Sequence, residues 1–338
     1  MRRINPDLNY DNDELFEHHQ LTVDPGQQLT RIDKYLTHKL PNVTRNRIQN
    51  AIKAELVLVN KTPVKANYKV HPGDEIQLFL PEPPRTNEVI PEDIPLTIVH
   101  EDDTLMVIDK PAGMVVHPAT ENWTGTLVNG LVFYLEKQDV EFPGLVHRID
   151  KDTTGLLVVP KTEAAKGHLS RQFAAHTTSR TYRAIVWGEP KEDEGTIRGA
   201  IARHPKDRRV MTVYPDNEKG KPAVSHYTVL ERFRYVSLVE CRLETGRTHQ
   251  IRAHFRYLGH PLFSDGTYGG DKILKGAVFS KYKAFVENCF ELLPRQALHA
   301  KSLGFTHPAT GEWMAFDSEL PADMVAVLEK WRRYVQYN

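Results

Sequence analysis

The segment HRIDKDTTG, residues 147–155, brings several ionisable side chains together. Arg148 and Asp150 are two positions apart, so on an extended chain their side chains project from the same face. A carboxylate held there could act as a nucleophile or as a general base. The same residues also suit a turn, where an aspartate before a strand is commonly a cap or a surface acceptor. This segment alone leaves both interpretations open.

A second group of ionisable residues lies in TGRTHQIRAH, which contains Arg247, His249, Arg252 and His254. If a helix begins near Thr248, Arg252 follows one turn later on the same face. Cations in the first turn of a helix oppose its dipole, so they favour a nearby anion. An arginine beside a carboxylate favours the ionised form of that carboxylate even when the pair is buried. The alternative is a solvated helix face.

Tyr182 stands between two arginines, Arg180 and Arg183, in the segment RTYRAIVWG. An aromatic ring flanked by cations can stack on a nucleobase while the cations hold phosphates. The simpler interpretation is a core tyrosine whose hydroxyl reaches the surface.

The elements that must position these residues are strands interrupted by helices. The predicted strands are GLLVVPK, TYRAIVWG, two antiparallel strands around Arg232 in SHYTVLERFRYVSLVECRLETG, and a hairpin in ALHAKSLGFTHPATGEWMAF. The predicted helices are TLVNGLVFYLEK, RTHQIRAHFRYLG and a closing PADMVAVLEKWRRY. Without a steady alternation of strand and helix, this order indicates an α+β fold with a mixed, mostly antiparallel sheet and flanking helices.

Four segments differ in composition. Residues 1–20 are polar and acidic, which predicts a flexible tail. Residues 21–80 predict a small α+β domain, with helices over 31–40 and from Thr44 followed by short strands. Residues 81–95 contain five prolines and predict a linker. Residues 96–338 form the large domain.

Charge is segregated along the chain although the formal net charge is zero. Residues 27–80 sum to +5 (nine basic, four acidic) and residues 197–210 to +4 (five basic, one acidic), whereas residues 82–109 sum to −7 (one basic, eight acidic). Salt screens distant acidic patches, so a basic face still attracts phosphates at short range. The helices of the small domain predict such a face, made of Arg31, Lys34, Arg45, Arg47 and Lys53. Chance clumping on a solvated surface is the alternative.

Composition excludes several classes of protein. No apolar run is long enough for a secretory signal or a membrane span. The two cysteines, Cys241 and Cys289, lack metal-ligand spacing and fit reduced thiols in the cytoplasm. The alternative is a single disulfide between them. No glycine-rich phosphate loop or dinucleotide fingerprint is present, which favours a reaction without a nucleotide cofactor or a metal.

Taken together, the motifs resemble the RluA/RluD-type family of pseudouridine synthases, which isomerise uridine in RNA. The family's H-R-L-D-x-x-T-S-G motif corresponds to HRIDKDTTG, with Ile149 and Thr154 as mild departures. TYRAIVWG and TGRTHQIRAH match its tyrosine and arginine motifs, and DKPAGMVVHP, ARHPKDRRVMTV and LHAKSLGF match further stretches in order. Residues 21–80 resemble the alpha-L module of ribosomal protein S4, an RNA-binding domain.

The resemblance implies a role for several residues. Asp150 is implied to be the catalytic aspartate, Tyr182 to pack against the target uracil, and Arg252 to pair with that aspartate. Arg148 resembles the residue that fills the gap when the uridine leaves its stack, and His147 and Arg247 belong to the same RNA-binding surface. Lys110 and His117 fall in a family motif and receive no chemical role.

The expected reaction breaks the glycosidic bond and rejoins the base through carbon 5, so it needs a carboxylate and no cofactor. The expected partner is RNA, most of all large-subunit ribosomal RNA, free or in a pre-ribosomal particle, with no membrane. Three alternatives remain: transfer RNA as substrate, a catalytically silent RNA-binding or ribosome-assembly protein, and a nucleoside or sugar hydrolase. The last needs a second acid, for which Asp152 is the nearby candidate.

Overall fold

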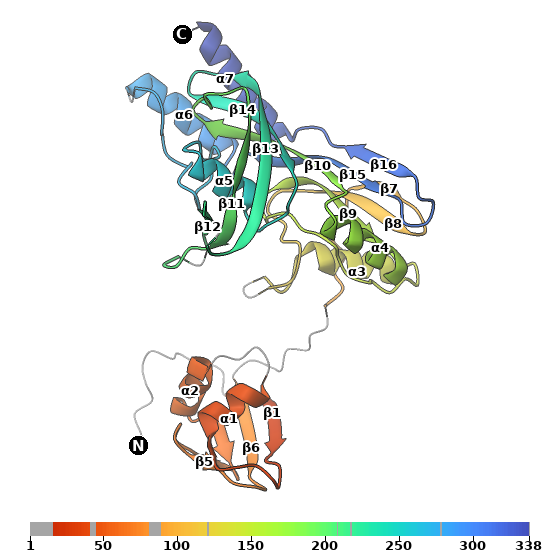
Figure 1. The fold of residues 1–338 in the computed structure, drawn as a ribbon, viewed down its shortest axis with the longest axis vertical. Helices are drawn as coiled ribbons and strands as arrows, with labels where there is room; N and C mark the ends of the chain where they lie inside the picture. Colours follow the sequence, from red (N-terminus) through yellow and green to blue (C-terminus); the bar gives the residue numbers. More distant parts are fainter. Residues whose placement is uncertain are drawn as a thin grey trace. The chain divides into compact units, whose positions relative to one another are not determined.

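The computed structural model describes residues 16–40, 45–80, 89–119, 122–207, 209–216, 218–277 and 279–337. The chain divides into two compact units, Met1–Glu88 and Val89–Asn338 (Figure 1). Among the helices that the structure describes, none is long and apolar enough to cross a membrane.

The N-terminal unit combines two helices with a four-stranded antiparallel sheet in the order β1-β6-β3-β4 and a small β2-β5 pair. Its elements are β1 (Phe16–Thr22), β2 (Thr30–Arg31), α1 (Ile32–Lys39), α2 (Arg45–Lys53), β3 (Val57–Val59), β4 (Thr62–Pro63), β5 (Lys69–Val70) and β6 (Glu75–Leu80). Ile32 and Leu36 of α1 and Ile48 of α2 are buried in one cluster with the strands. Their helical spacing is what makes these helices amphipathic.

Two segment boundaries differ from those predicted. Residues 16–20 were expected in the tail, yet they belong to β1, which pairs antiparallel with β6. Strand pairing satisfies the backbone of this polar segment, so it needs few apolar side chains to be ordered. Residues 1–15, the predicted helix start at Thr44 and linker residues 81–88 lie outside the described part of the chain.

The last part of the expected linker belongs to the C-terminal unit. The backbone N–H of Glu92 donates to the carbonyl of Asn129, and the Asn129 side chain donates to the carbonyl of Ile90. The prolines of this segment prevent regular structure, but they do not prevent packing against α3 (Leu127–Glu136).

The C-terminal unit is built on one ten-stranded sheet in the order β12-β11-β13-β14-β10-β15-β9-β8-β7, with β16 paired to β15. Only the β15–β9 pairing is parallel among these described strands. The remaining elements are β7 (Ile98–Glu101), β8 (Leu105–Lys110), β9 (Thr154–Pro160), α4 (Glu163–Ala174), β10 (Ser179–Trp187), β11 (Glu194–Arg203), β12 (Met211–Tyr214), β13 (Lys221–Arg232), β14 (Val236–Leu243), α5 (Gln250–Tyr257), α6 (Ser280–Leu292), β15 (Leu298–Thr306), β16 (Trp313–Asp317) and α7 (Ala322–Tyr337). The predicted α+β class with a mostly antiparallel sheet is confirmed.

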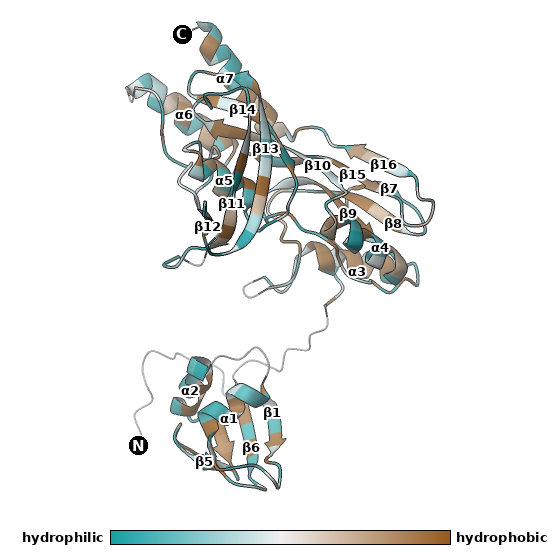
Figure 2. Ribbon diagram, viewed as in Figure 1, coloured by the Kyte–Doolittle hydropathy of each residue, from teal (hydrophilic) through white to brown (hydrophobic). Residues whose placement is uncertain are grey.

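Successive strand residues point to opposite sides of a sheet, so strands with consecutive apolar residues place them on both faces. Helices cover both faces of this sheet. Met106 and Ile108 of β8 pack with α3 and α5, whereas Leu105 and Val107 pack with α4. A third cluster joins α6 and α7 to β10 and β14. Figure 2 shows the apolar residues along the strands that these helices cover. The sequence analysis did not predict α4, α6 or the β11–β12 hairpin.

The helix expected to begin near Thr248 begins instead at Gln250. Thr248 and His249 form a turn, and His249 occupies the cap position with φ +52°, in the left-handed region. Because α5 begins at Gln250, Arg252 lies in its first turn. The shorter helix therefore still points Arg252 at the loop before β9.

Candidate active site

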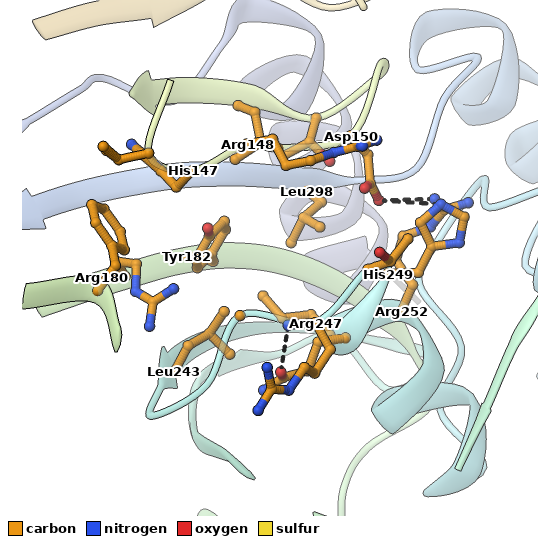
Figure 3. A pocket seen from close by; sticks show the side chains of 18 of the residues that line it. His147, Arg148, Asp150, Arg180, Tyr182, Leu243, Arg247, His249, Arg252 and Leu298 are labelled. Atoms are coloured by element: carbon orange, nitrogen blue, oxygen red, sulfur yellow. Dashed lines mark hydrogen bonds and ion pairs between the residues drawn. The ribbon is translucent and has the colours of Figure 1, made fainter. Parts of the chain in front are cut away.

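A cavity of about 560 Å³ opens between the loop before β9, the strands β10 and β15, and the connection from β14 to α5 (Figure 3). It collects residues from the three motifs that the sequence analysis singled out. Those lining it are His147, Arg148, Asp150, Tyr182, Arg247 and Arg252, together with His117 from the fourth motif. Residues more than a hundred positions apart thus share one site.

Asp150 and Arg252 form an ion pair at the wall of this cavity. Nη1 of Arg252 donates to Oδ2 of Asp150 at 3.0 Å. The Asp150 side chain is 18% exposed, whereas that of Arg252 is 6% exposed. Among the described residues, no other group donates a hydrogen bond to the Asp150 carboxylate. Its Oδ1 is therefore available to a ligand.

Asp265, a residue that the sequence analysis missed, holds Arg252 from the other side. Nε and Nη2 of Arg252 donate to Oδ2 and Oδ1 of Asp265 at 2.7 and 2.9 Å. Asp265 Oδ1 also accepts from the backbone N–H groups of Thr267 and Tyr268. The segment SDGTYGG carries this turn signal, because an aspartate commonly accepts from the backbone two and three residues later.

Two carboxylates stabilise the positive charge of Arg252. Burial alone would lower the pKa of Arg252, but the hydrogen bonds and charges of Asp265 and then Asp150 raise it above its usual range. Arg252 is a fixed cation clamped by one buried and one half-buried carboxylate. A bidentate contact to Asp265 sets the plane of the guanidinium, and this plane aims Nη1 at Asp150.

His249 lies near Oδ2 of Asp150, the oxygen that Arg252 binds, but it forms no hydrogen bond to this oxygen. Its Nε2 is 3.8 Å from Oδ2 of Asp150, and its Nδ1 is 3.1 Å from the hydroxyl of Tyr268. Burial lowers the pKa of His249, and the charge of Arg252 adds to this effect against the opposing charge of Asp150. The imidazole is therefore neutral near pH 7.

Tyr182 projects from β10 into the middle of the cavity (Figure 3). The side chain is largely buried and also packs in the main core cluster. Burial raises the pKa of its hydroxyl, so the ring remains a neutral phenol. It presents a flat aromatic surface between Asp150 and Arg180.

His147, Arg148 and Arg247 line the cavity but differ in their contacts with the rest of the protein. Nε2 of His147 accepts from the backbone N–H of Val158, and its ring stacks on Phe173 at 4.5 Å. Burial and then the charge of Arg180 lower the pKa of His147 to about 3, so it is a neutral structural part of the wall. Arg148 is exposed at the rim. Arg247 donates from Nε to the carbonyl of Pro222.

Lys110 is fully buried and holds the loop that carries Asp150. Its Nζ donates to the carbonyls of Pro111, Met114 and Lys151 at 2.7–3.0 Å. Burial lowers the pKa of Lys110 to about 7, against the opposing charges of Asp152 and Asp150. The lysine of the DKPAG segment thus joins the loop after β8 to the loop that carries Asp150.

Two of the basic residues that were predicted to bind phosphates in the N-terminal unit are paired with a carboxylate of the protein. Arg31 and Arg45 both bind the buried carboxylate of Asp33, which also accepts from Gln49. Lys53 is exposed at the end of α2, and the side chain of Arg47 lies outside the described part of the structure. Asp33 therefore cancels one of the positive charges expected on this face.

Comparison with known proteins assigns both units. The model of the RNA pseudouridylate synthase family matches residues 104–257, and that of the S4 domain matches residues 30–76. A protein of Chlorobaculum parvum, named as an RNA pseudouridine synthase, is 50% identical over 92% of this chain and 97% of its own length. The ribosomal large subunit pseudouridine synthase D of Nitrosomonas europaea is 42% identical over 93% of this chain and 88% of its own length.

Solved structures agree with this assignment. Human RNA pseudouridylate synthase domain containing 4 is similar, with a TM-score of 0.55 and 25% identity over 70% of this chain and 93% of the human chain. The family whose motifs the sequence resembles is therefore also the family of its relatives along nearly the whole chain. This protein belongs to the RNA pseudouridine synthase family and carries an S4 domain in its N-terminal unit.

Proposed function

We propose that this enzyme converts specific uridines of large-subunit ribosomal RNA to pseudouridine, with Asp150 as the catalytic carboxylate. The observation that carries the proposal is the 3.0 Å ion pair between Asp150 and Arg252 on the wall of a cavity that also exposes Tyr182. Relatives in Nitrosomonas europaea and Neisseria meningitidis, 42–43% identical, are named as acting on the large ribosomal subunit.

The reaction moves a base without adding or removing any group except a proton. The bond from C1′ of the ribose to N1 of uracil breaks, the base turns, and C5 bonds to C1′ while C5 loses its proton and N1 gains one. Asp150 faces the ribose and acts there either as a nucleophile or as a base. Arg252 donates to Oδ2 of Asp150 at 3.0 Å and so holds the carboxylate at the cavity wall.

A target uridine must leave its stack before it reaches Asp150. Unstacking costs a few kcal/mol, which contacts in the pocket can offset. Tyr182 offers the uracil an aromatic face inside the cavity. Arg148, exposed at the rim, fills the gap that the base leaves in the RNA.

The N-terminal unit docks structured RNA, and the C-terminal unit performs the chemistry. Lys34 and Lys53 are exposed on α1 and α2. Replacing both by glutamine should lower the slope of log affinity against log salt by about one to two. An unchanged slope would show that this face does not bind phosphates.

Tritium release from ribosomal RNA labelled at C5 of uracil tests the reaction. Asp150→Asn should reduce the single-turnover rate by about 10²–10⁴-fold or more, because the reacting carboxylate is lost. Asp152→Asn is the matched control, since it removes a carboxylate from the same loop, and it should retain activity. Free uracil among the products, or loss of activity in Asp152→Asn, would favour a hydrolase instead.

The same assay separates the substrates. Release from ribosomal RNA but not from transfer RNA supports the proposed substrate, and the reverse pattern replaces it. Ribosomal RNA in a pre-ribosomal particle should be compared with the free molecule. If neither RNA releases tritium with the wild-type enzyme, the proposed activity on these substrates is wrong.

A further inference from the structure

Arg180 is a buried cation at the wall of the active-site cavity without an anionic partner. The residue is 9% exposed. Its Nη2 donates a long hydrogen bond of 3.4 Å to the carbonyl of Glu244, and its Nε has no partner. The guanidinium also lies 5.4 Å from the ring centre of Phe173. Within the described ranges of the chain, no carboxylate forms an ion pair with it.

This arrangement is unfavourable in the free protein. A guanidinium does not lose its proton inside a protein, so burial leaves a charge that needs compensation. The other buried arginine of the cavity, Arg252, has two carboxylates. Asp150 is the one carboxylate among the described residues that line the cavity, and Arg252 already binds it. The charge of Arg180 is therefore left for a ligand.

The chain leaves room for this guanidinium. A Cβ atom at Gly246 would lie 2.7 Å from Nη1 of Arg180, closer than such atoms approach each other. Gly246 itself lines the cavity, in the turn between β14 and α5. The missing side chain at this position lets Arg180 reach the cavity.

Arg180 and Asp150 lie on either side of Tyr182 (Figure 3). Arg180 and Tyr182 are two positions apart on β10, so they share one face of the strand. Both charges act on the Tyr182 hydroxyl: after burial, Arg180 lowers and Asp150 raises its pKa. A uridine with its ribose at Asp150 and its base along Tyr182 would extend towards Arg180.

We propose that Arg180 forms a binding site for a negatively charged oxygen of the RNA substrate. The inference rests on the proposed function and adds a residue to that site. Two oxygens have this chemistry. One belongs to a phosphate beside the target uridine. The other is a carbonyl oxygen of uracil. When the glycosidic bond breaks, its electron pair stays on the uracil ring, and the carbonyl oxygen shares the negative charge. The charge disappears when C5 bonds to C1′ with an electron pair of the ring, C5 loses its proton and N1 gains one.

Four variants test the proposal. Arg180→Met removes the charge and keeps an apolar stem, and Arg180→Lys keeps the charge without the planar fork. Gly246→Ala keeps the arginine but displaces its guanidinium. Arg333→Met is the matched control, because Arg333 is exposed on α7, which does not line the cavity. Tryptophan fluorescence during unfolding checks that each variant folds.

Two readouts separate the two oxygens. The dissociation constant for RNA and its salt slope are measured in the Asp150→Asn background, and the single-turnover rate is measured at saturating RNA. If Arg180 binds a phosphate, Arg180→Met should weaken binding about 10-fold and lower the salt slope by about one, with little change in rate. If it binds a uracil oxygen, the rate should fall about 10²-fold while binding is unchanged.

Arg180→Lys should lose less than Arg180→Met, and Gly246→Ala should show the same kind of defect. If Arg180→Met folds and matches Arg333→Met in both readouts, the inference is wrong. Should Arg180→Met fail to fold, Gly246→Ala decides by the same criterion. A wild-type enzyme that releases no tritium overturns the proposed function, and the binding measurement alone then decides whether Arg180 holds a phosphate.

Discussion

Each unit of this protein contains a cluster of arginine and aspartate, and the two clusters differ in their ratio. In the N-terminal unit, Arg31 and Arg45 share the carboxylate of Asp33, whose side chain is 0% exposed. In the C-terminal unit, one arginine, Arg252, is shared by Asp150 and Asp265. Both oxygens of the Asp33 carboxylate accept hydrogen bonds, whereas the Asp150 carboxylate accepts from described residues through one oxygen only.

The ratio indicates what each cluster can do. A carboxylate surrounded by donors has no oxygen left for a ligand, so Asp33 connects α1 to α2 and stabilises the unit. An arginine bound to two carboxylates can be fixed in place by one of them while it positions the other. Asp265 supplies the fixed end, and Asp150 keeps an oxygen that faces the cavity. The same residue types thus serve stability in one unit and chemistry in the other.

The largest expected effect comes from removing the fixed end of the catalytic cluster. Asp265→Asn should lower the single-turnover rate of tritium release at saturating RNA by about 10–100-fold, because Arg252 loses a charged, bidentate partner and no longer aims Nη1 at Asp150. The dissociation constant for RNA should stay within about 2-fold of the wild-type value, since Asp265 is a positioning residue that touches no substrate.

A neighbouring carboxylate supplies the control for this variant. Asp271 is exposed in the same connection, and Asp271→Asn should leave the rate unchanged. If Asp265→Asn lowers the melting temperature but not the rate, the second carboxylate only stabilises the fold. The two clusters would then not differ in function.

The N-terminal cluster should respond in the opposite way. Asp33→Asn should destabilise the N-terminal unit by about 2 kcal/mol, less than is usual for a broken buried pair because both arginines are exposed by more than 40% and regain water. Amide hydrogen exchange in α1 and α2 measures this loss. The tritium release rate at saturating RNA should not change.

Tryptophan fluorescence provides an internal reference for that experiment. All four tryptophans, at positions 123, 187, 313 and 331, belong to the C-terminal unit. Their unfolding transition should be the same in Asp33→Asn and in the wild type. A shifted transition would mean that the two units do not unfold independently.

A further difference between the units is expected in how they respond to acid. Burial lowers the pKa of His147 to about 3 and of His254 to about 4, so below about pH 6.5 the unfolded chain binds protons that the folded C-terminal unit does not. Stability of that unit should fall with decreasing pH, by at most about 1.4 kcal/mol per pH unit for each histidine.

The N-terminal unit should keep its stability to lower pH. Burial would raise the pKa of Asp33, but hydrogen bonds from Arg31, Gln49 and Arg45 hold it well below its usual range. Its contribution is therefore complete above about pH 5 and is lost as the unfolded carboxylate takes up a proton near pH 4. Urea unfolding followed at several pH values tests the order, and earlier loss of the N-terminal unit would contradict it.

Local sequence patterns were sufficient for much of the fold. Short apolar runs predicted β9 and β10, the β15–β16 hairpin was also predicted, and helical patterns predicted α1, α3 and α7. The start of α5 was misplaced because a turn at Thr248 and His249 precedes it, and α4 and α6 were missed altogether. Helix ends depend on caps and neighbouring elements more than on periodicity.

By itself, the sequence determined which residues are candidates for chemistry, because residue types, spacing and motif order are local properties. Asp150, Tyr182 and Arg252 could be singled out because their motifs resemble those of a known family. Only the tertiary structure decided which charges meet: Asp265 lies behind Arg252, Asp33 lies between two arginines, and no carboxylate of the described residues pairs with Arg180. Ion pairs and burial depend on contacts between segments far apart in the chain, and a single sequence does not encode these distances in any local pattern.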